Sequence, residues 1–258
     1  MLRVCSLGSG SAGNGLVVEA SDGLRASRVL VDDGFNLRQL GRRLQRVGLD
    51  VEALDAVFIT HEHSDHSAGV AALARRHHIP VYCTEGTAHA CSYDDYGIRW
   101  NRIEVGRAVD IGALRIEAFE VPHDASEPVQ FTFTDGVRRA GLLTDAGECS
   151  AAIVRALSGL HALVLECNHD LQMLHQGTYP AFLKSRIGSA RGHLSNVQAA
   201  EILQLIDRTK LEWVAAAHLS SSNNRPELAQ LALAGVLCCA AAEITVADQL
   251  DGLPWRVV

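Results

Sequence analysis

The feature that most constrains this chain is a polar segment that directly follows an apolar run. The apolar run spans residues 56–59 (AVFI) and is β-branched and aromatic, which predicts a buried strand. The polar segment spans residues 60–66 (THEHSDH) and leads into a helix-like run at residues 68–76. Side chains two residues apart point the same way in an extended segment, so His61 and His63 can share one metal ion. Asp65 and His66 are adjacent near the helix start and are placed to serve a second one.

An exposed loop that happens to be rich in histidine is the alternative interpretation of residues 60–66. We disfavour it because a match to all the fixed positions, directly after a strand, is rare by chance. Glu62 lies between the first two histidines, and we assign it no chemistry.

Composition sets broad limits on the function. The chain has 258 residues, 48% hydrophobic and 21% charged, which suits a soluble globular protein of one large or two modest domains. The formal net charge of −7 gives no global basic field that would draw the chain to nucleic acid. Seven cysteines without a CxxC pair predict reduced thiols in a cytoplasmic protein. The N-terminus has no long apolar segment for secretion or membrane spanning.

Two candidate positions precede the central motif. Residues 8–15 (GSGSAGNG) lie between two strand-like runs and predict a hairpin turn, which opens toward the site through Ser11 and Asn14. The strand at residues 28–31 ends at Asp32. A carboxylate there could orient a metal-bound imidazole, and an ordinary turn acid is an equally good interpretation.

Further polar groups follow later strands. Residues 109–121 predict a hairpin that delivers His123 and Asp124, where a third ligand for the metal of His61 and His63 is needed. The hairpin 131–144 turns at an Asp-Gly pair and delivers Asp145. Asp145 has two oxygens with which to bridge two cations; its alternative role is the N-cap of a helix at residues 149–157.

The last clusters follow the strands predicted at residues 162–165 and 213–217. They begin at Glu166 and His218, and a separate cluster around His193 precedes a helix that Ser195 or Asn196 would cap. Collected, the candidate metal ligands are His61, His63, Asp65, His66, His123, Asp145 and His218. Five imidazoles and two carboxylates suit two borderline metal ions, Zn²⁺ or else Mn²⁺.

This ordered series resembles the metallo-β-lactamase superfamily. The resemblance implies an α/β (α+β) fold, a four-layer αββα sandwich of two mixed sheets with helices outside. It implies a single domain over residues 1–258, with pseudo-symmetric halves of about 1–125 and 126–258. One metal would take His61, His63 and His123, and the other would take Asp65, His66 and His218, with Asp145 bridging.

The motifs at residues 8–14, 123–128, 165–170, 192–196 and 218–224 resemble the YycJ (WalJ) family in particular. That resemblance implies a bacterial, cytoplasmic protein with nuclease activity on DNA. Glu166 and His193 also resemble the Glu–His pair of tRNase Z-type phosphodiesterases, in which the histidine protonates the leaving oxygen. The resemblance therefore implies catalytic roles for Asp65, His193 and Glu166. It also implies metal-supporting or substrate-binding roles for Asp32, Ser11, Asn14, Asp124, Ser195, Asn196, Asn223 and Asn224.

The chain departs from larger relatives in one respect. The stretch between Asp145 and His218 is too short for the inserted domain of the β-CASP nucleases, so the core itself must hold the substrate. The basic candidates for this are Lys184, Arg186 and Arg191. Three charges are few, so phosphate contacts would be weak and sensitive to salt.

Three functions compete on these grounds. The leading hypothesis is a dinuclear metal-dependent phosphodiesterase or nuclease that acts on DNA rather than RNA and uses a metal-bridging hydroxide. A hydrolase of small thioesters or lactones, of the glyoxalase II type, is favoured by the acidic charge and by the few aromatic residues available for base stacking. A metal-bound scaffold is disfavoured because no ligand of the set is missing. His66 argues against typical β-lactam hydrolases, several of which replace it.

Overall fold

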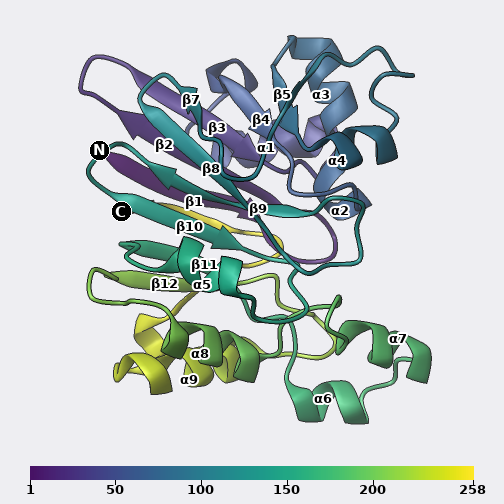
Figure 1. The fold of residues 1–258 in the computed structure, drawn as a ribbon, viewed down its shortest axis with the longest axis vertical. Coiled ribbons are helices and arrows are strands. Elements are labelled where there is room, and N and C mark those ends of the chain that lie inside the picture. Colours follow the sequence, from purple (N-terminus) through teal and green to yellow (C-terminus); the bar gives the residue numbers. More distant parts are fainter.

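Two seven-stranded β-sheets pack face to face, with helices on their outer faces (Figure 1). The computed structural model describes residues 1–258. The first sheet has the strand order β14-β1-β2-β3-β4-β5-β6. Its strands are β1 (Leu2–Gly8), β2 (Gly15–Ser21), β3 (Ala26–Val31), β4 (Ala56–Phe58), β5 (Val81–Cys83), β6 (Trp100–Arg102) and β14 (Leu253–Val257).

The second sheet has the order β13-β12-β11-β10-β9-β8-β7. Its strands are β7 (Val109–Ile111), β8 (Leu114–Glu120), β9 (Val129–Thr134), β10 (Arg139–Leu143), β11 (Ala162–Glu166), β12 (Trp213–Ala217) and β13 (Thr245–Val246). Both sheets mix antiparallel and parallel pairs, because β1–β3 and β7–β10 form meanders while β3–β6 and β10–β13 run parallel. The predicted sandwich of two mixed sheets is confirmed.

The helices are short and lie in the connections between strands. They are α1 (Leu37–Arg46), α2 (Ser64–Ser67), α3 (Val70–His77), α4 (Glu85–Ala90), α5 (Ala151–Leu157), α6 (Leu171–Gln176), α7 (Ala181–Ile187), α8 (Asn196–Leu205) and α9 (Pro226–Leu237), with 3₁₀ turns at Val51–Ala53 and Ala241–Glu243. No helix combines the length and hydrophobicity that crossing a bilayer requires.

Alternation along the strands builds three apolar layers. On β1, Leu2 and Val4 face the second sheet and join a 25-residue core between the sheets, whereas Cys5 and Leu7 face outward and pack in the cluster that contains α1 and α3. On β11, Val164 faces inward, and its neighbours face the cluster that contains α8 and α9. Central strands buried on both faces explain the continuous apolar runs in the sequence.

Local signals set several boundaries where the sequence predicts them. Asn36 caps α1 and forms a capping box with Gln39, and Gly48 follows the helix with φ 75°. Pro226 occupies the first turn of α9. Residues 8–15 form the turn between antiparallel β1 and β2, as predicted.

Other boundaries differ from the predictions. The helix predicted at residues 149–157 begins at Ala151 and is capped by Ser150, so Asp145 is not its N-cap. The helix predicted at residues 68–76 begins at Val70, because α2 forms a separate turn over residues 64–67. Helices α6 and α7 were not predicted, since they carry almost no buried apolar residues that would give a helical period.

The C-terminal strand closes the first sheet. β14 pairs antiparallel with β1, and the amide of Val258 donates to the carbonyl of Leu2 at 2.9 Å. The chain crosses to the second sheet between residues 102 and 109, and β14 returns to the first, so the sheets do not coincide with the halves 1–125 and 126–258. On the surface of the first sheet, the buried carboxylate of Glu19 pairs with Arg3 and Arg28, each at 2.6 Å.

Candidate active site

The candidate site lies where loops from both sheets meet at one edge of the sandwich. β4 of the first sheet leads into residues 60–66. In the second sheet, β8, β10, β11 and β12 lead to His123, Asp145, Glu166 and His218. Strand ends at one edge of a sheet bring residues that are distant in sequence together, and this is where α/β proteins build their sites.

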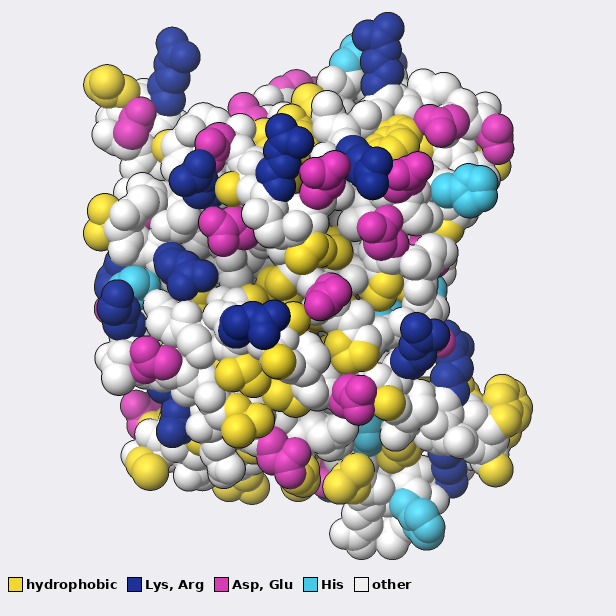
Figure 2. Space-filling model, in the orientation of Figure 1, with side chains coloured by type: hydrophobic (Ala, Val, Ile, Leu, Met, Phe, Trp, Pro, Cys, Tyr) yellow, Lys and Arg dark blue, Asp and Glu magenta, His cyan; other side chains and the backbone are white.

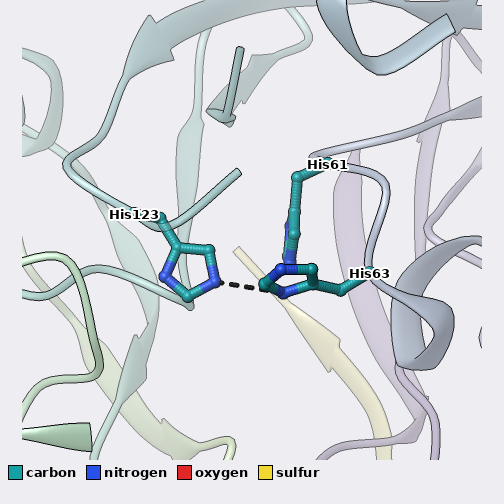
Figure 3. A group of neighbouring side chains, drawn as sticks. All are labelled: His61, His63 and His123. Atoms are coloured by element: carbon teal, nitrogen blue, oxygen red, sulfur yellow. Dashed lines mark hydrogen bonds between the residues drawn. The ribbon is translucent and has the colours of Figure 1, made fainter. Parts of the chain in front are cut away.

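Three imidazoles form the first group, shown in Figure 3. The ligand atoms of His61, His63 and His123 all lie within 4.8 Å of one another. His61 Nδ1 lies 2.9 Å from the hydroxyl of Thr60, and His123 Nδ1 donates to the carbonyl of Gly192 at 3.0 Å. These bonds leave the Nε2 atoms of His61 and His123 free to face the centre of the group. There His123 Nε2 lies 3.3 Å from His63 Nδ1. Fixing one ring nitrogen so that the other is free is how proteins orient metal-binding histidines.

A second group combines Asp65, His66 and His218, whose ligand atoms also lie within 4.8 Å of one another. His66 Nδ1 donates to Asp32 Oδ2 at 2.8 Å, while the other oxygen of Asp32 accepts from the amide of Thr60. His66 Nε2 lies 3.5 Å from Asp65, and His218 Nε2 lies 3.6 Å from the same oxygen. Asp32 therefore fixes the orientation of the His66 ring, which is the first of the two roles that the sequence left open for Asp32.

Asp145 lies between the two groups. Its Oδ2 is 3.1 Å from His66 Nε2, and its Oδ1 is 3.7 Å from His218 Nε2 and 4.0 Å from His123 Nε2. Burial opposes ionisation, but His218 and His66 hold the pKa of Asp145 well below its usual range. A single anionic side chain thus reaches toward both groups.

The donor set fits divalent metal ions. His61 Nε2 and His218 Nε2 are buried and have no hydrogen-bond partner, which is costly for a polar atom unless it binds an ion. Burial and the neighbouring His66 lower the pKa of His61 well below its ordinary value, so its ring is neutral and has a lone pair to donate. Imidazole and carboxylate together suit borderline metals.

Glu166 and His193 form a pair beside these groups. Glu166 Oε1 accepts from His193 Nδ1 at 2.9 Å and from His218 Nδ1 at 3.2 Å, while Oε2 accepts from the amides of Ala146 and Leu194. Burial opposes ionisation, but His193 and His218 lower the pKa of Glu166 to about 2. Burial likewise opposes the charge on His193, but Glu166 raises the pKa of that imidazole. This combination favours a charged donor facing the site.

Three of the site residues adopt left-handed backbone conformations. Asp32, Asp145 and His218 have φ of 61°, 54° and 54°. Asp32 and His218 directly follow strands and Asp145 lies two residues after one, and the left-handed residue turns the chain sharply so that its side chain faces the centre. Such conformations cost on the order of 1–3 kcal/mol each and cluster at functional sites.

A cleft of about 400 Å³ opens onto the centre. One wall is polar and includes Ser11, His63, Asp65, Asp145, His193 and His218. Further lining residues come from α7 and the loop before it, namely Tyr179, Leu183, Arg186 and Ile187. The volume lies within the ~300–1,000 Å³ typical of sites for one small ligand.

The supporting residues predicted from the sequence divide into two sets. Ser11 lines the cleft, and Asn14 Nδ2 lies 3.0 Å from His66 Nε2. Asp124 also lines the cleft, where its carboxylate accepts from Arg186 at 2.6 Å. This ion pair offsets the charge of Arg186, so the basic surface is weaker than the sequence suggests.

Ser195, Asn196, Asn223 and Asn224 do not line the cleft, so of the two roles predicted for them, support of the site fits their position better than substrate binding. Ser195 caps α8. Asn196 and Asn224 exchange hydrogen bonds at 2.9 Å, and Asn224 Nδ2 donates to the carbonyl of Cys167. Their polar groups hold the loops behind the site together and are not available to a substrate.

Sequence reasoning overlooked several residues at the site. Thr60 links Asp32 to His61, and its place at the head of the central motif was a usable signal. Asn168 Nδ2 donates to the carbonyl of His218 at 3.0 Å. Tyr179 lies in the loop before α7 and Leu183 on α7, and neither segment gave a signal in the sequence.

Comparison with known proteins gives the class. Residues 27–214 match the family described as "Beta-lactamase superfamily domain". Exodeoxyribonuclease YycJ of Bacillus anthracis is 35% identical over 92% of this chain and 89% of its own. Exodeoxyribonuclease WalJ of Streptococcus pneumoniae is 36% identical over 90% of this chain and 86% of its own. The crystal structure of the metallo-β-lactamase fold protein YhfI from Bacillus subtilis superposes with a TM-score of 0.75 at 17% identity, covering 99% of this chain and 98% of that one, which supports the fold.

The chain therefore belongs to the metallo-β-lactamase superfamily and, within it, to the YycJ (WalJ) family.

Proposed function

We propose that this protein is a metal-dependent nuclease that hydrolyses phosphodiester bonds, in DNA rather than RNA. The observation that carries the proposal is the position of the Glu166–His193 pair, which adjoins two ligand groups that share Asp145. A phosphodiester needs both charge stabilisation at the phosphate and a proton donor at its leaving oxygen. The exodeoxyribonuclease names of the YycJ and WalJ relatives support the same conclusion.

Two divalent ions, Zn²⁺ in the first place and Mn²⁺ as the alternative, are proposed to occupy the site. His61, His63 and His123 would hold one, Asp65, His66 and His218 would hold the other, and Asp145 would serve both. When bound, such ions lower the pKa of water and stabilise negative charge on phosphoryl oxygens.

The protein's own residues are proposed to supply the remaining chemistry. Asp65 lines the cleft and orients the attacking water. Glu166 accepts from His193 Nδ1, which leaves Nε2 to donate a proton to the leaving oxygen. Asp32 keeps His66 in one orientation and one tautomer. Each role needs a side chain held before the substrate arrives, which the buried hydrogen bonds provide.

A small-molecule hydrolase acting on thioesters or lactones is the second candidate. The formal net charge of −7 and the Asp124–Arg186 ion pair favour it, because both weaken attraction for a polyanion. A thioester leaving group is a good one and needs no proton donor, so this candidate leaves the Glu166–His193 pair without a role.

We further propose that residues 1–258 act as a single domain and that the protein works in the cytoplasm. The seven cysteines, none in a disulfide, agree with a reducing compartment.

The test is cleavage of end-labelled duplex DNA, single-stranded DNA and RNA by protein of known metal content. Asp65→Ala should abolish digestion, whereas Asp95→Ala, an exposed acid away from the site, should leave it intact. Two metals per chain with no digestion of any nucleic acid would defeat the nuclease proposal and move the assay to thioesters and lactones.

A further inference from the structure

The α6–α7 arm (residues 171–187) connects β11 to α8 and contributes little to the core. α7 has no buried residue, and α6 has one, Leu174. The arm lies at the edge of the molecule, away from the body of the sandwich (Figure 1). Packing in the core therefore does not account for the residue types in this arm, several of which line the cleft.

An exposed aromatic residue occupies this arm. Five of the six phenylalanines are buried, but Phe182 is 76% exposed. Phe182 lies four residues before Arg186 on α7, so the two side chains share one face of the helix. Arg186 and half-buried Tyr179 line the cleft, and Phe182 is exposed on the same short helix as Arg186. Two aromatic rings thus lie three residues apart in the chain, one in the cleft and one exposed on the helix that helps to line it.

Basic side chains accompany these rings. Lys184 and Arg186 lie on α7, and Arg191 follows it; Asp124 offsets the charge of Arg186, so Lys184 and Arg191 supply the unpaired charges. In Figure 2, dark blue Lys and Arg side chains lie beside hydrophobic side chains at the edge of the molecule where Figure 1 places α7. Aromatic rings combined with cationic groups along a groove are the usual means of holding a single nucleic-acid strand.

We propose that Phe182 and Tyr179 stack on unpaired nucleobases of a strand whose phosphate lies at the metal centre. The inference rests on the proposed nuclease function and deepens it. In a duplex the faces of the bases are covered by their neighbours, so rings can stack only on a single strand or a frayed end. The cleft volume of about 400 Å³ suits one nucleotide and not a double helix. Stacking is tolerant of sequence, so the arm selects strand structure and not base identity.

Binding of a single strand tests this directly, without cleavage. The probe is a single-stranded, phosphorothioate-linked oligonucleotide carrying 2-aminopurine at its terminal positions, because the fluorescence of this base is quenched on stacking. The metal-loaded parent should quench it. Phe182→Ala and Tyr179→Ala should weaken binding by about 5- to 150-fold, which corresponds to one stacked base. Phe182→Trp and Tyr179→Phe should restore quenching, and Leu231→Ala, an exposed apolar residue on α9, is the matched control.

An oligonucleotide with abasic terminal positions, whose binding is followed by the anisotropy of a dye at its other end, completes a double-mutant cycle. If the ring and the base contact each other, Phe182→Ala should cost nothing further once the base is absent. Equal quenching by the parent and both alanine variants, or equal losses on normal and abasic strands, would overturn the inference. That second pattern would arise if Phe182 instead contacts a protein partner or only supports the arm. Failure of the parent to cleave unmodified DNA or RNA would count against the proposed function alone, since quenching is measured separately.

Discussion

Replacing Glu166 by glutamine is the sharpest test of the proton-donor assignment. The carboxylate accepts four hydrogen bonds, two from imidazoles at 2.9 and 3.2 Å and two from backbone amides at 3.0 and 3.2 Å. An amide of the same size keeps one oxygen for the backbone donors and turns an NH₂ group toward His193 and His218. Each hydrogen bond to a charged group contributes about 1.5–3 kcal/mol, so losing two of them should lower the free energy of unfolding by about 3–6 kcal/mol. Relaxation of the loops would reduce this loss.

The effect on catalysis should exceed the effect on binding. Without the carboxylate, His193 loses both its orientation and its raised pKa, and general acid catalysis typically contributes about 10²- to 10⁴-fold. We therefore expect kcat on an oligonucleotide to fall by about 100-fold or more, with KM changed much less. The assay is steady-state cleavage at fixed metal content, measured beside Glu117→Gln, an exposed acid on β8.

Unchanged kcat in Glu166→Gln at two metals per chain would refute the reasoning. A loss of activity that follows loss of metal would assign Glu166 to support of His218 and not to proton transfer. Metal analysis of the purified variant separates these outcomes.

Three further predictions follow from the fold and the site. Gly34→Ala places a Cβ 1.9 Å from the carbonyl oxygen of Asp65, so it should destabilise the protein by about 3 kcal/mol and reduce its metal content. Gly41→Ala on α1, where a Cβ meets no neighbour, should change neither the stability nor the metal content, as measured by thermal unfolding and metal analysis. Burial opposes ionisation of Glu19, but its two arginine partners outweigh burial and lower the pKa of this carboxyl. The ion pairs should therefore add about 1–3 kcal/mol to the free energy of unfolding at pH 7, and this contribution should be lost as the pH falls below about 4. Glu19→Gln should be less stable than the parent at pH 7 and equally stable in acid, as measured by unfolding at both pH values. Chelation should lower Tm by several degrees and readdition of Zn²⁺ or Mn²⁺ should restore it, because ions bind only the folded chain; an unchanged Tm would show that the site does not hold metal tightly.

The sequence predicts the strands and their clusters well because both have local signals. Apolar runs such as residues 56–59 and 162–165 are continuous, as expected for strands buried on both faces, and each ends at polar residues. The spacing of His61 and His63 predicts that they share one metal ion. The order of the strands along the chain then indicates His123 as the third ligand. The left-handed backbone at Asp32 and Asp145 is less visible, since turn residues indicate a bend without its conformation, and nothing local predicts it at His218.

What the sequence could not give are contacts between distant surface groups. The ion pair of Asp124 with Arg186 joins residues far apart in the chain, so Arg186 was counted as free positive charge. The sequence leaves metal support and substrate binding open for Ser195, Asn196, Asn223 and Asn224, because polarity alone does not distinguish a residue that lines a cleft from one that joins two loops. The α6–α7 arm buries too little to leave a periodic pattern.

The pairing of β14 with β1 has a consequence for biosynthesis. A chain made from its N-terminus completes residues 2–102 early, yet β1 lacks one neighbour until residues 253–257 have been synthesised. An unpaired strand edge is a template for association with other chains, and contacts between ends of a sequence are slow to form. We therefore expect chaperones to engage the first sheet throughout translation. The second proposed metal group must wait as well, because His218 leaves the ribosome long after Asp65 and His66.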